Sequence, residues 1–295
     1  MKCFTLELLL LGCGLALSPL SAQTVHAEPT KVIYSAGESA QDTRYEDVKE
    51  ILRRALERTE PEYGPFVLEK SNVFTNGLRD RHRLASNDIH VLWYTTSIEM
   101  ERDFTPIRIP LRKGLLGYRI ALIRKDSQAM LEQVRNATDL RKFTIGQGYG
   151  WDDKKVYEYH AIPVTEGPFN YLFKMLDHHR FDLLPRGIGQ VQLDLGQVGK
   201  DLPQLAIEEK LLFHYPWPYY FFFNKSNMEL KNRVELGLRK MIKDGSFDAI
   251  FWKYNRHAIE SLNLKKRRVI ELYNPLLPKE TPLDDASLWF NPLMK

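Results

Sequence analysis

"TTSIEMERDFTPIRIPL" (Thr95–Leu111) directly follows "DIHVLWY" (Asp88–Tyr94), an apolar run that predicts a buried strand. Two small hydroxyl residues, Thr95 and Ser97, therefore stand at the end of that strand, and Arg102 comes after them in the same stretch. A guanidinium offers a planar fork of donors that matches the two oxygens of a carboxylate, and hydroxyl groups can supply the remaining hydrogen bonds. The pattern predicts a binding site for an acidic group. The alternative for Arg102 is a surface ion pair with Glu99 or Glu101.

Around this stretch, strand-like and helix-like runs alternate along the chain. "YEDVKEILRRALERT" (Tyr45–Thr59) has apolar residues at helical spacing with a charged opposite face, and "GYRIALIRK" (Gly117–Lys125) reads as a strand. "FTIGQGYG" (Phe143–Gly150) predicts a strand that ends in a glycine-rich turn, and "WDDKKVYEYH" (Trp151–His160) then begins like a helix. Such alternation favours a fold of α/β layers.

The first 27 residues have the layout of a secretory signal peptide. A single lysine precedes a leucine-rich apolar stretch, and small residues follow at Ser21, Ala22 and Ala27. We therefore expect the mature protein to begin near Glu28 and to be periplasmic. "LLGC", which ends at Cys13, resembles a lipoprotein processing box, but the apolar run continues beyond it, so lipidation is the less favoured alternative.

Composition excludes several classes of function. Both cysteines, Cys3 and Cys13, lie in the leader, so the mature chain has no thiol for a disulfide, a metal or catalysis. The formal net charge of +4 is too mild to indicate a nucleic-acid partner. Neither "GxSxG" nor "HExxH" occurs, and the adjacent His178 and His179 would point in different directions on a helix. We expect no cofactor and no metal, and a monomer.

The stretch Thr95–Leu111 resembles the ligand-binding segment of the bacterial family 3 solute-binding proteins, the periplasmic receptors for polar amino acids. In that family, hydroxyl residues and an arginine hold the α-carboxylate of the ligand, and by position they match Thr95, Ser97 and Arg102. Further segments resemble the family in the same order along the chain: "LRKFTIGQGYGWDDKKV" (Leu140–Val156), "LDHHRFDLLPRG" (Leu176–Gly187) and "LRKMIKDGSFDAIFWKY" (Leu238–Tyr254).

The resemblance implies a two-lobed type II periplasmic binding protein fold with a hinge of two crossover strands. Lobe 1 would comprise residues 28–117 and 219–295, the latter including a C-terminal extension, and lobe 2 residues 118–218. The implied function is capture of a small carboxylate-bearing or anionic solute, amino-acid-like, between the lobes. Delivery would be to the permease of an ABC-type transporter or to a sensor protein.

The second lobe departs from the amino-acid receptors at one important position. Where the family has an acidic residue for the ligand's amino group, this chain has Pro185, Arg186 and Gly187. A second arginine would repel an ammonium group and favour a second anionic group on the ligand. The alternative for Arg186 is a solvated loop residue. On the same side, the backbone from Gly150 to Asp153, including Asp152, is expected to offer amide donors at a helix start.

Several aromatic residues fall at expected ligand-facing positions, where flat rings commonly hold the apolar part of a ligand. They are Tyr34, Trp93, Tyr94, Tyr149 and Trp151. Each could instead be a core or rim residue.

An enzyme is the alternative function, because the same fold hosts dehydratases of the cyclohexadienyl type and fold alone does not fix function. It would need a carboxylate acting as general acid or base, for which Asp152 and Glu99 are the candidates. "KKRR" (Lys265–Arg268) is most simply exposed charge after the last helix, and contact with an anionic membrane surface or a partner is its alternative.

Overall fold

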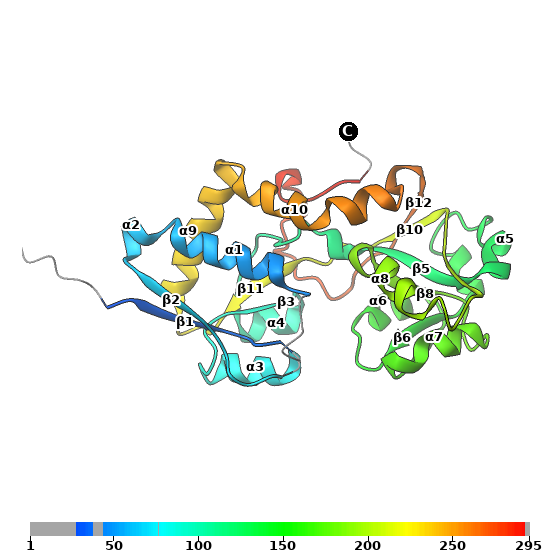
Figure 1. Ribbon diagram of the computed structural model, residues 1–295, viewed down its shortest axis with the longest axis horizontal. Coiled ribbons are helices and arrows are strands. Elements are labelled where there is room, and N and C mark those ends of the chain that lie inside the picture. Colours follow the sequence, from blue (N-terminus) through cyan, green and yellow to red (C-terminus); the bar gives the residue numbers. More distant parts are fainter. Residues whose placement is uncertain (1–27, 38–43, 76, 293–295) are drawn as a thin grey trace, which may run out of the picture.

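The computed structural model describes residues 28–37, 44–75 and 77–292. The expected signal peptide and its cysteines lie outside these residues. Figure 1 shows two lobes side by side, spanned along one edge by α10 (Ser246–Ser261). Within the described ranges, no helix is long and apolar enough to cross a membrane.

Lobe 1 is built on a mixed sheet. In spatial order its strands are β2 (Phe66–Lys70), β1 (Thr30–Tyr34), β3 (Leu92–Thr95), β11 (Tyr219–Phe223) and β4 (Thr105–Ile107). β1 and β2 run parallel, a bridge from Tyr34 to Val91 joins them to β3, and β11 lies antiparallel to β3 and β4. β11, the last of these strands in sequence, therefore lies between β3 and β4 inside the sheet. It returns the chain from lobe 2 to lobe 1.

Helices cover both faces of this sheet. They are α1 (Glu46–Glu57), α2 (Glu60–Tyr63), α3 (Gly77–Ala85), α4 (Ile98–Asp103) and α9 (Met228–Lys243). The amphipathic face predicted for the first of them is buried, with Val48, Ile51 and Leu52 in the lobe 1 core. α9 packs closely on α1 because it has Gly237, where a Cβ would lie 2.1 Å from the carbonyl oxygen of Ala55.

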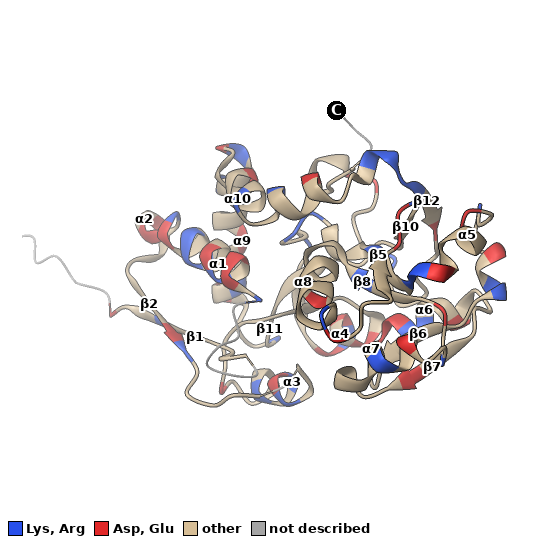
Figure 2. Ribbon diagram, turned by 45° about the vertical axis from the view of Figure 1, so that its right-hand side comes forward, with Lys and Arg blue, Asp and Glu red and all other residues tan. Residues whose placement is uncertain are grey.

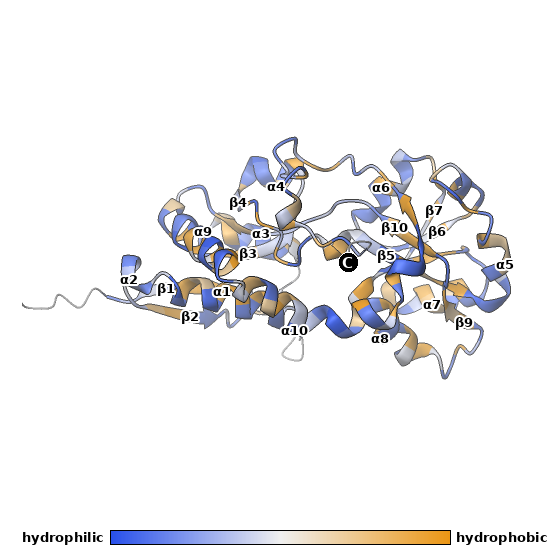
Figure 3. Ribbon diagram, turned by 90° about the horizontal axis from the view of Figure 1, so that it is seen from above, coloured by the Kyte–Doolittle hydropathy of each residue, from blue (hydrophilic) through white to orange (hydrophobic). Residues whose placement is uncertain are grey.

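Lobe 2 has its own sheet, and Figure 3 shows hydrophobic residues among its strands. In spatial order they are β7 (Val164–Gly167), β6 (Ile145–Gly148), β8 (Leu184–Gly187), β5 (Tyr118–Arg124), β10 (Leu211–His214) and β12 (Arg268–Glu271), with β9 (Leu205–Ile207) also paired to β5. The helices of this lobe are α5 (Gln128–Leu131), α6 (Asp153–Tyr159), α7 (Phe169–Asp177) and α8 (Ile188–Val198). Apolar side chains form one core on each face of the sheet.

Two crossovers carry the chain between the lobes, one from β4 to β5 and one from β10 to β11. They run side by side at Gly117, whose carbonyl accepts a hydrogen bond from the amide of Tyr215 at 3.1 Å. A Cβ at position 117 would lie 2.4 Å from the Tyr215 carbonyl oxygen, so this approach requires glycine. Trp217 then donates from Nε1 to the carbonyl of Thr96 at 3.2 Å, which fixes the second crossover to lobe 1.

α10 belongs to both lobes. Phe247 and Ile250 in its first half pack into the lobe 1 core, whereas Phe251 packs into a core of lobe 2. At its far end, Ser261 Oγ donates to Gln192 Oε1 of α8 at 3.0 Å. The helix therefore lies as a continuous brace along the hinge (Figure 1).

The residues after α10 correct the predicted division of the chain, which gave 219–295 to lobe 1. β12 pairs in parallel with β10 and is part of the lobe 2 sheet. The physical reason is that α10 delivers the chain to lobe 2. Residues 272–292, here called the C-terminal segment, then return toward lobe 1, where the amide of Ile98 donates to the carbonyl of Leu276 at 3.0 Å.

Candidate functional site

The carboxyl end of β3 in lobe 1 and the carboxyl end of β6 in lobe 2 lie toward each other. Tyr94 at the end of β3 is partly buried, and burial raises the pKa of its phenol above the ordinary value. The negative charge of Asp152, which follows β6 in lobe 2, raises that pKa further. Tyr94 and Asp152 thus belong to different lobes, and each lies at or just after the carboxyl end of a strand.

Lobe 1 presents a group of aromatic rings near its strand ends. The ring centroid of Trp93 lies 5.7 Å from that of Tyr34 and 5.9 Å from that of Tyr45. Tyr45 also stacks on Tyr219 with centroids 6.2 Å apart, and Tyr219 is the residue directly opposite Thr95 in the sheet. This aromatic group comes from β1, β3, β11 and the residue before α1, so four separate segments position it.

A partly buried ion pair lies against the aromatic group. Arg112 donates from Nε and Nη2 to the two carboxylate oxygens of Asp47 at 2.6 and 2.7 Å. Its guanidinium carbon lies 5.7 Å from the ring centroid of Tyr45 and 5.9 Å from that of Tyr219, which is cation–π distance. Burial opposes the charge of Arg112, but Asp47 outweighs it, and the pKa of Arg112 is raised.

Lobe 2 has a second buried network at the start of β5. Arg119 donates from Nε to the hydroxyl of Tyr215 at 3.0 Å and from Nη2 to Asp153 at 2.9 Å. The Tyr215 hydroxyl also donates to Asp153, and it lies 3.2 Å from the hydroxyl of Tyr157. Burial raises the pKa of both phenols, so these tyrosines stay protonated as donors.

Arg186 lies at the carboxyl end of β8 and is buried. Its Nε donates to Asp194 of α8 at 2.5 Å, and its guanidinium carbon lies 4.7 Å from the ring centroid of Trp151 and 5.3 Å from that of Phe169. The alternative of a solvated loop residue is therefore wrong for Arg186. The strand places the guanidinium between two rings and one carboxylate.

Comparison with known proteins gives matches in structure but not in sequence. No family model and no curated protein matches the chain. An ancestral arginine-binding protein bound to arginine is 18% identical, with 76% of this chain and 97% of that chain covered and a TM-score of 0.52. A histidine kinase sensor domain with similarity to periplasmic binding proteins is 14% identical, with 78% and 96% covered and a TM-score of 0.53. The ancestral amino-acid-binding protein AncCDT-1, a precursor of cyclohexadienyl dehydratase, is 16% identical, with 77% and 95% covered and a TM-score of 0.50.

The chain has the type II periplasmic binding protein fold. The predicted fold class is confirmed. In open α/β sheets, ligands bind outside the carboxyl ends of the strands. In this periplasmic-binding-protein fold those ends carry Tyr34 and Thr95 in lobe 1, and Tyr149 and Arg186 in lobe 2.

The predicted carboxylate fork does not form in this periplasmic-binding-protein fold. Arg102 lies on α4 with its side chain 68% exposed, and its Nε donates to the neighbouring Asp103 at 2.8 Å. Its carbonyl accepts from Lys225, which follows β11, and because β11 is antiparallel to β3 this is the end of the sheet away from Thr95. Ser97 accepts a hydrogen bond from the amide of Met100 at 3.1 Å and caps α4. The six-residue helix thus turns Arg102 away from Thr95.

The predicted amide donors of lobe 2 are partly used within the chain. Of the amides from Gly150 to Asp153, that of Trp151 donates to the carbonyl of Gly148 at 3.1 Å. Asp152 pairs with Lys155 at 2.8 Å, and Tyr149 is 67% exposed beside the turn that Gly150 makes with φ of 76°. The turn therefore offers exposed side chains, and the Trp151 amide is already bonded within it.

Several polar groups at these strand ends were missed by sequence reasoning. Arg119 sits in an otherwise apolar strand, and Asp153 and Tyr215 pair with it only after folding. Gln147 of β6 is buried at 1% exposure, and its Oε1 has no hydrogen-bond partner among the described residues. Buried charges in a strand and acidic residues after a glycine turn were the signals that could have found them.

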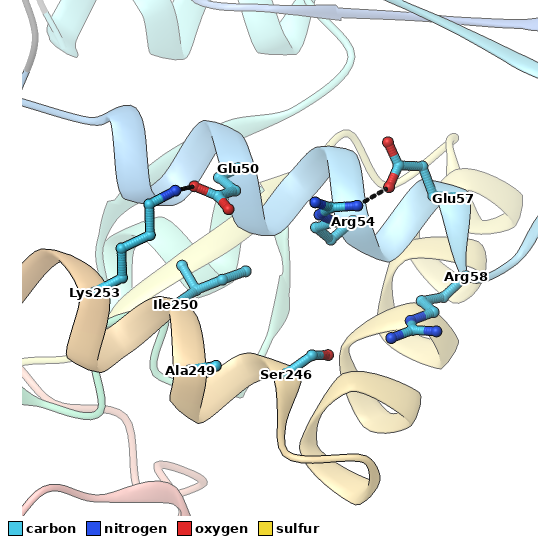
Figure 4. Close-up of a pocket in the computed structure, with 8 residues that line it drawn as sticks. All are labelled: Glu50, Arg54, Glu57, Arg58, Ser246, Ala249, Ile250 and Lys253. Atoms are coloured by element: carbon cyan, nitrogen blue, oxygen red, sulfur yellow. Dashed lines mark hydrogen bonds and ion pairs between the residues drawn. The ribbon is translucent and has the colours of Figure 1, made fainter.

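Two cavities among the described residues lie away from the facing strand ends. One of about 530 Å³ lies between α1 and α10, where Glu50 pairs with Lys253 and Arg54 with Glu57 (Figure 4). The other lies between α10 and the C-terminal segment. Within the described residues, no group of three or more histidine, cysteine, aspartate or glutamate side chains is arranged to hold a metal ion.

Proposed function

We propose that the protein captures a small carboxylate-bearing or anionic solute between its lobes and delivers it to an ABC-type transporter or a sensor. The observation that carries this proposal is the two-lobed periplasmic-binding-protein fold, with Thr95 at a carboxyl strand end of lobe 1 and Arg186 at a carboxyl strand end of lobe 2. A solute held there would touch both lobes, and only a closed arrangement allows that. Neighbours of the same fold include a protein bound to arginine and a sensor domain.

Within this function, we propose Arg186 in place of Arg102 as the anion contact. The hydrogen bond from Arg186 to Asp194 uses only Nε, and a guanidinium has five N–H donors. Trp151 and Phe169 hold its plane, so a carboxylate could meet two parallel donors in a fixed direction. The partly exposed rings of Tyr34 and Tyr45, with Thr95 at the end of β3, would cover the solute from lobe 1.

The aromatic content of the facing surfaces favours a solute with a flat or apolar part. Trp93 is buried in the lobe 1 core and supports the partly exposed ring of Tyr34, whereas Tyr149 stands exposed on lobe 2. A solute that carried a carboxylate and an apolar body would use both kinds of contact. This distinguishes the proposed ligand from a bare inorganic anion.

The enzyme alternative receives less support from the geometry. Its two candidate carboxylates already have basic partners, Glu99 with Arg81 at 2.6 Å and Asp152 with Lys155 at 2.8 Å. A general acid needs a carboxyl group that stays protonated near neutral pH, and such groups lie in apolar surroundings. We therefore propose binding rather than turnover.

A thermal-shift screen of dicarboxylates, acidic amino acids and aromatic acids tests the proposal, followed by small-angle scattering with any solute found. We expect a raised melting temperature and a smaller radius of gyration at saturation. An unchanged scattering profile with a saturating ligand would contradict closure. Conversion of prephenate or arogenate to product would establish the enzyme alternative instead.

We also propose that residues 1–27 direct export and are removed. Intact-mass spectrometry of the protein from the periplasmic fraction should give a chain that starts near Glu28. A mass that retains the leader, or that includes a diacylglycerol on Cys13, would contradict this.

A further inference from the structure

The second cavity lies behind the hinge, between α10 and the C-terminal segment, and has a volume of about 670 Å³. Ligand pockets are commonly ~300–1,000 Å³. Its apolar lining includes Phe251, Trp252, Leu264, Trp289 and Phe290. This is a different surface from the facing strand ends, so its occupant would be a separate ligand.

The aromatic part of the cavity is held rigidly. The ring centroid of Phe290 lies 5.5 Å from that of Phe251 and 5.8 Å from that of Trp252. The amide of Phe290 donates to the carbonyl of Lys113 at 2.7 Å, and Trp289 packs so closely on Gly114 that a Cβ there would lie 2.3 Å from its ring. Rings fixed from both sides form a preformed surface, which lowers the entropy lost when a flat ligand binds.

The basic run Lys265–Arg268 after α10 has two parts: its arginines bond to the backbone, and its lysines line this cavity. Arg267 donates from Nη1 to the carbonyls of Glu208 and Leu211, and Arg268 donates to the carbonyl of Val134. The prediction of exposed charge was therefore wrong for Arg267, whose side chain is 7% exposed. Lys265 and Lys266 are exposed and line the cavity. They belong to the basic stretch that leads into β12, drawn in blue in Figure 2.

The remaining charges of the cavity compensate one another. Lys113 pairs with Asp248 at 2.7 Å, and Arg256 pairs with Glu260 at 3.3 Å. Across the part of the chain that the structure describes, neither Lys265 nor Lys266 forms an ion pair with a carboxylate. The cavity thus has an aromatic wall and an uncompensated positive rim.

We propose that this cavity is a second binding site, which takes a small amphipathic anion with a flat aromatic body and a single carboxylate or sulfonate. The aromatic body would lie against Trp252 and Phe290, with the anionic group at Lys265 and Lys266. A membrane surface fits less well, because it would need the whole basic run exposed, and the two arginines are already bonded within the fold. The proposal rests on the cavity alone and does not require the proposed solute-binding function.

Fluorescence titration of the mature protein with 8-anilinonaphthalene-1-sulfonate, an aromatic monoanion, tests the site. We expect one saturable site, about three- to tenfold weaker in the variant Lys265→Glu/Lys266→Glu at low salt, as two exposed charge contacts imply. Lys243→Glu is the matched control, because that lysine is exposed at the end of α9 and lies outside the cavity lining. Trp252→Ala should weaken binding of the probe at least as much as the double lysine variant does.

Equal probe affinity in the double lysine variant and in Lys243→Glu would overturn the proposal. Melting temperatures of all variants identify any loss of folding, and Lys265→Gln/Lys266→Gln repeats the test without reversing charge. Co-sedimentation with phosphatidylglycerol vesicles that the double lysine variant abolishes, without saturable probe binding, would favour the membrane alternative and reject the site.

Discussion

Arg119 donates from Nη2 to the Asp153 carboxylate at 2.9 Å. This ion pair joins the start of β5 to the first turn of α6, where lobe 2 meets the hinge. The two side chains are 8% and 17% exposed. Removing one partner of a buried pair leaves an uncompensated charge, which commonly costs ~3–5 kcal/mol.

Asp153→Ala should therefore lower the free energy of unfolding by about 3 to 5 kcal/mol. Asp152→Ala is the matched control, since its exposed pair with Lys155 should be worth less than ~1 kcal/mol. Urea unfolding followed by tryptophan fluorescence measures both. Equal losses in the two variants would mean that the Arg119 network contributes little to stability.

Buried tyrosines predict a loss of stability at alkaline pH. Burial raises the pKa of Tyr118 to about 12, from an unfolded value of ~10. Between these values the unfolded chain releases a proton that the folded chain keeps, so the free energy of unfolding falls as pH rises. The stabilising contribution is fully present below pH ~10 and is lost as pH approaches 12.

Tyr118→Phe should reduce this decline. We expect a smaller change in the urea midpoint between pH 8 and 11 than in the wild type, and absorbance at 295 nm should show one high-pH phenol fewer. Tyr149→Phe, at a 67% exposed position, is the control and should leave the slope unchanged. A wild-type slope in Tyr118→Phe would contradict the assignment.

Substitutions of Arg186 and Arg102 should differ in their effect on solute affinity. Arg186→Lys keeps a positive charge for Asp194 but cannot present two parallel donors to a carboxylate. For a solute found by screening, we expect this variant to weaken binding by about 2 to 5 kcal/mol in calorimetry. Arg102→Ala should change the affinity less than about twofold, because its guanidinium is exposed and paired with Asp103. The reverse result would restore Arg102 as the fork.

The C-terminal segment should restrain the hinge. Asn274 is buried at 1% exposure, and its Nδ2 donates to the carbonyl of Pro216 in the second crossover at 3.0 Å. Asn274→Ala leaves the Pro216 carbonyl without this donor, which should lower the free energy of unfolding by ~1–3 kcal/mol. It should also broaden the distribution of distances between the lobes. Electron-spin resonance between labels at Ser86→Cys and Lys174→Cys would measure them. Asn232→Ala, on the exposed face of α9, should leave the distances unchanged.

Local patterns predicted the elements well where burial is decided within one segment. The apolar face of α1 and the glycine turn at Gly150 follow from spacing and backbone freedom alone. Arg102 was misplaced because a six-residue helix between β3 and β4 sets its direction, and the length of that helix is not readable from the residues. Arg119, Asp153 and Tyr215 come from three segments, so their network depends on contacts that no single pattern contains.

The surroundings of the C-terminal segment should change when the hinge moves. Phe290 is hydrogen-bonded to Lys113 in the first crossover and packs on α10, so displacement of one lobe against the other must change the surroundings of the residues beside it. Because the cysteines of the chain lie in the leader, an environment-sensitive dye on a single cysteine at the exposed position 286 would label the processed protein at one site. The same architecture that braces the lobes would thus turn the protein into an optical sensor whose reporter never touches the solute.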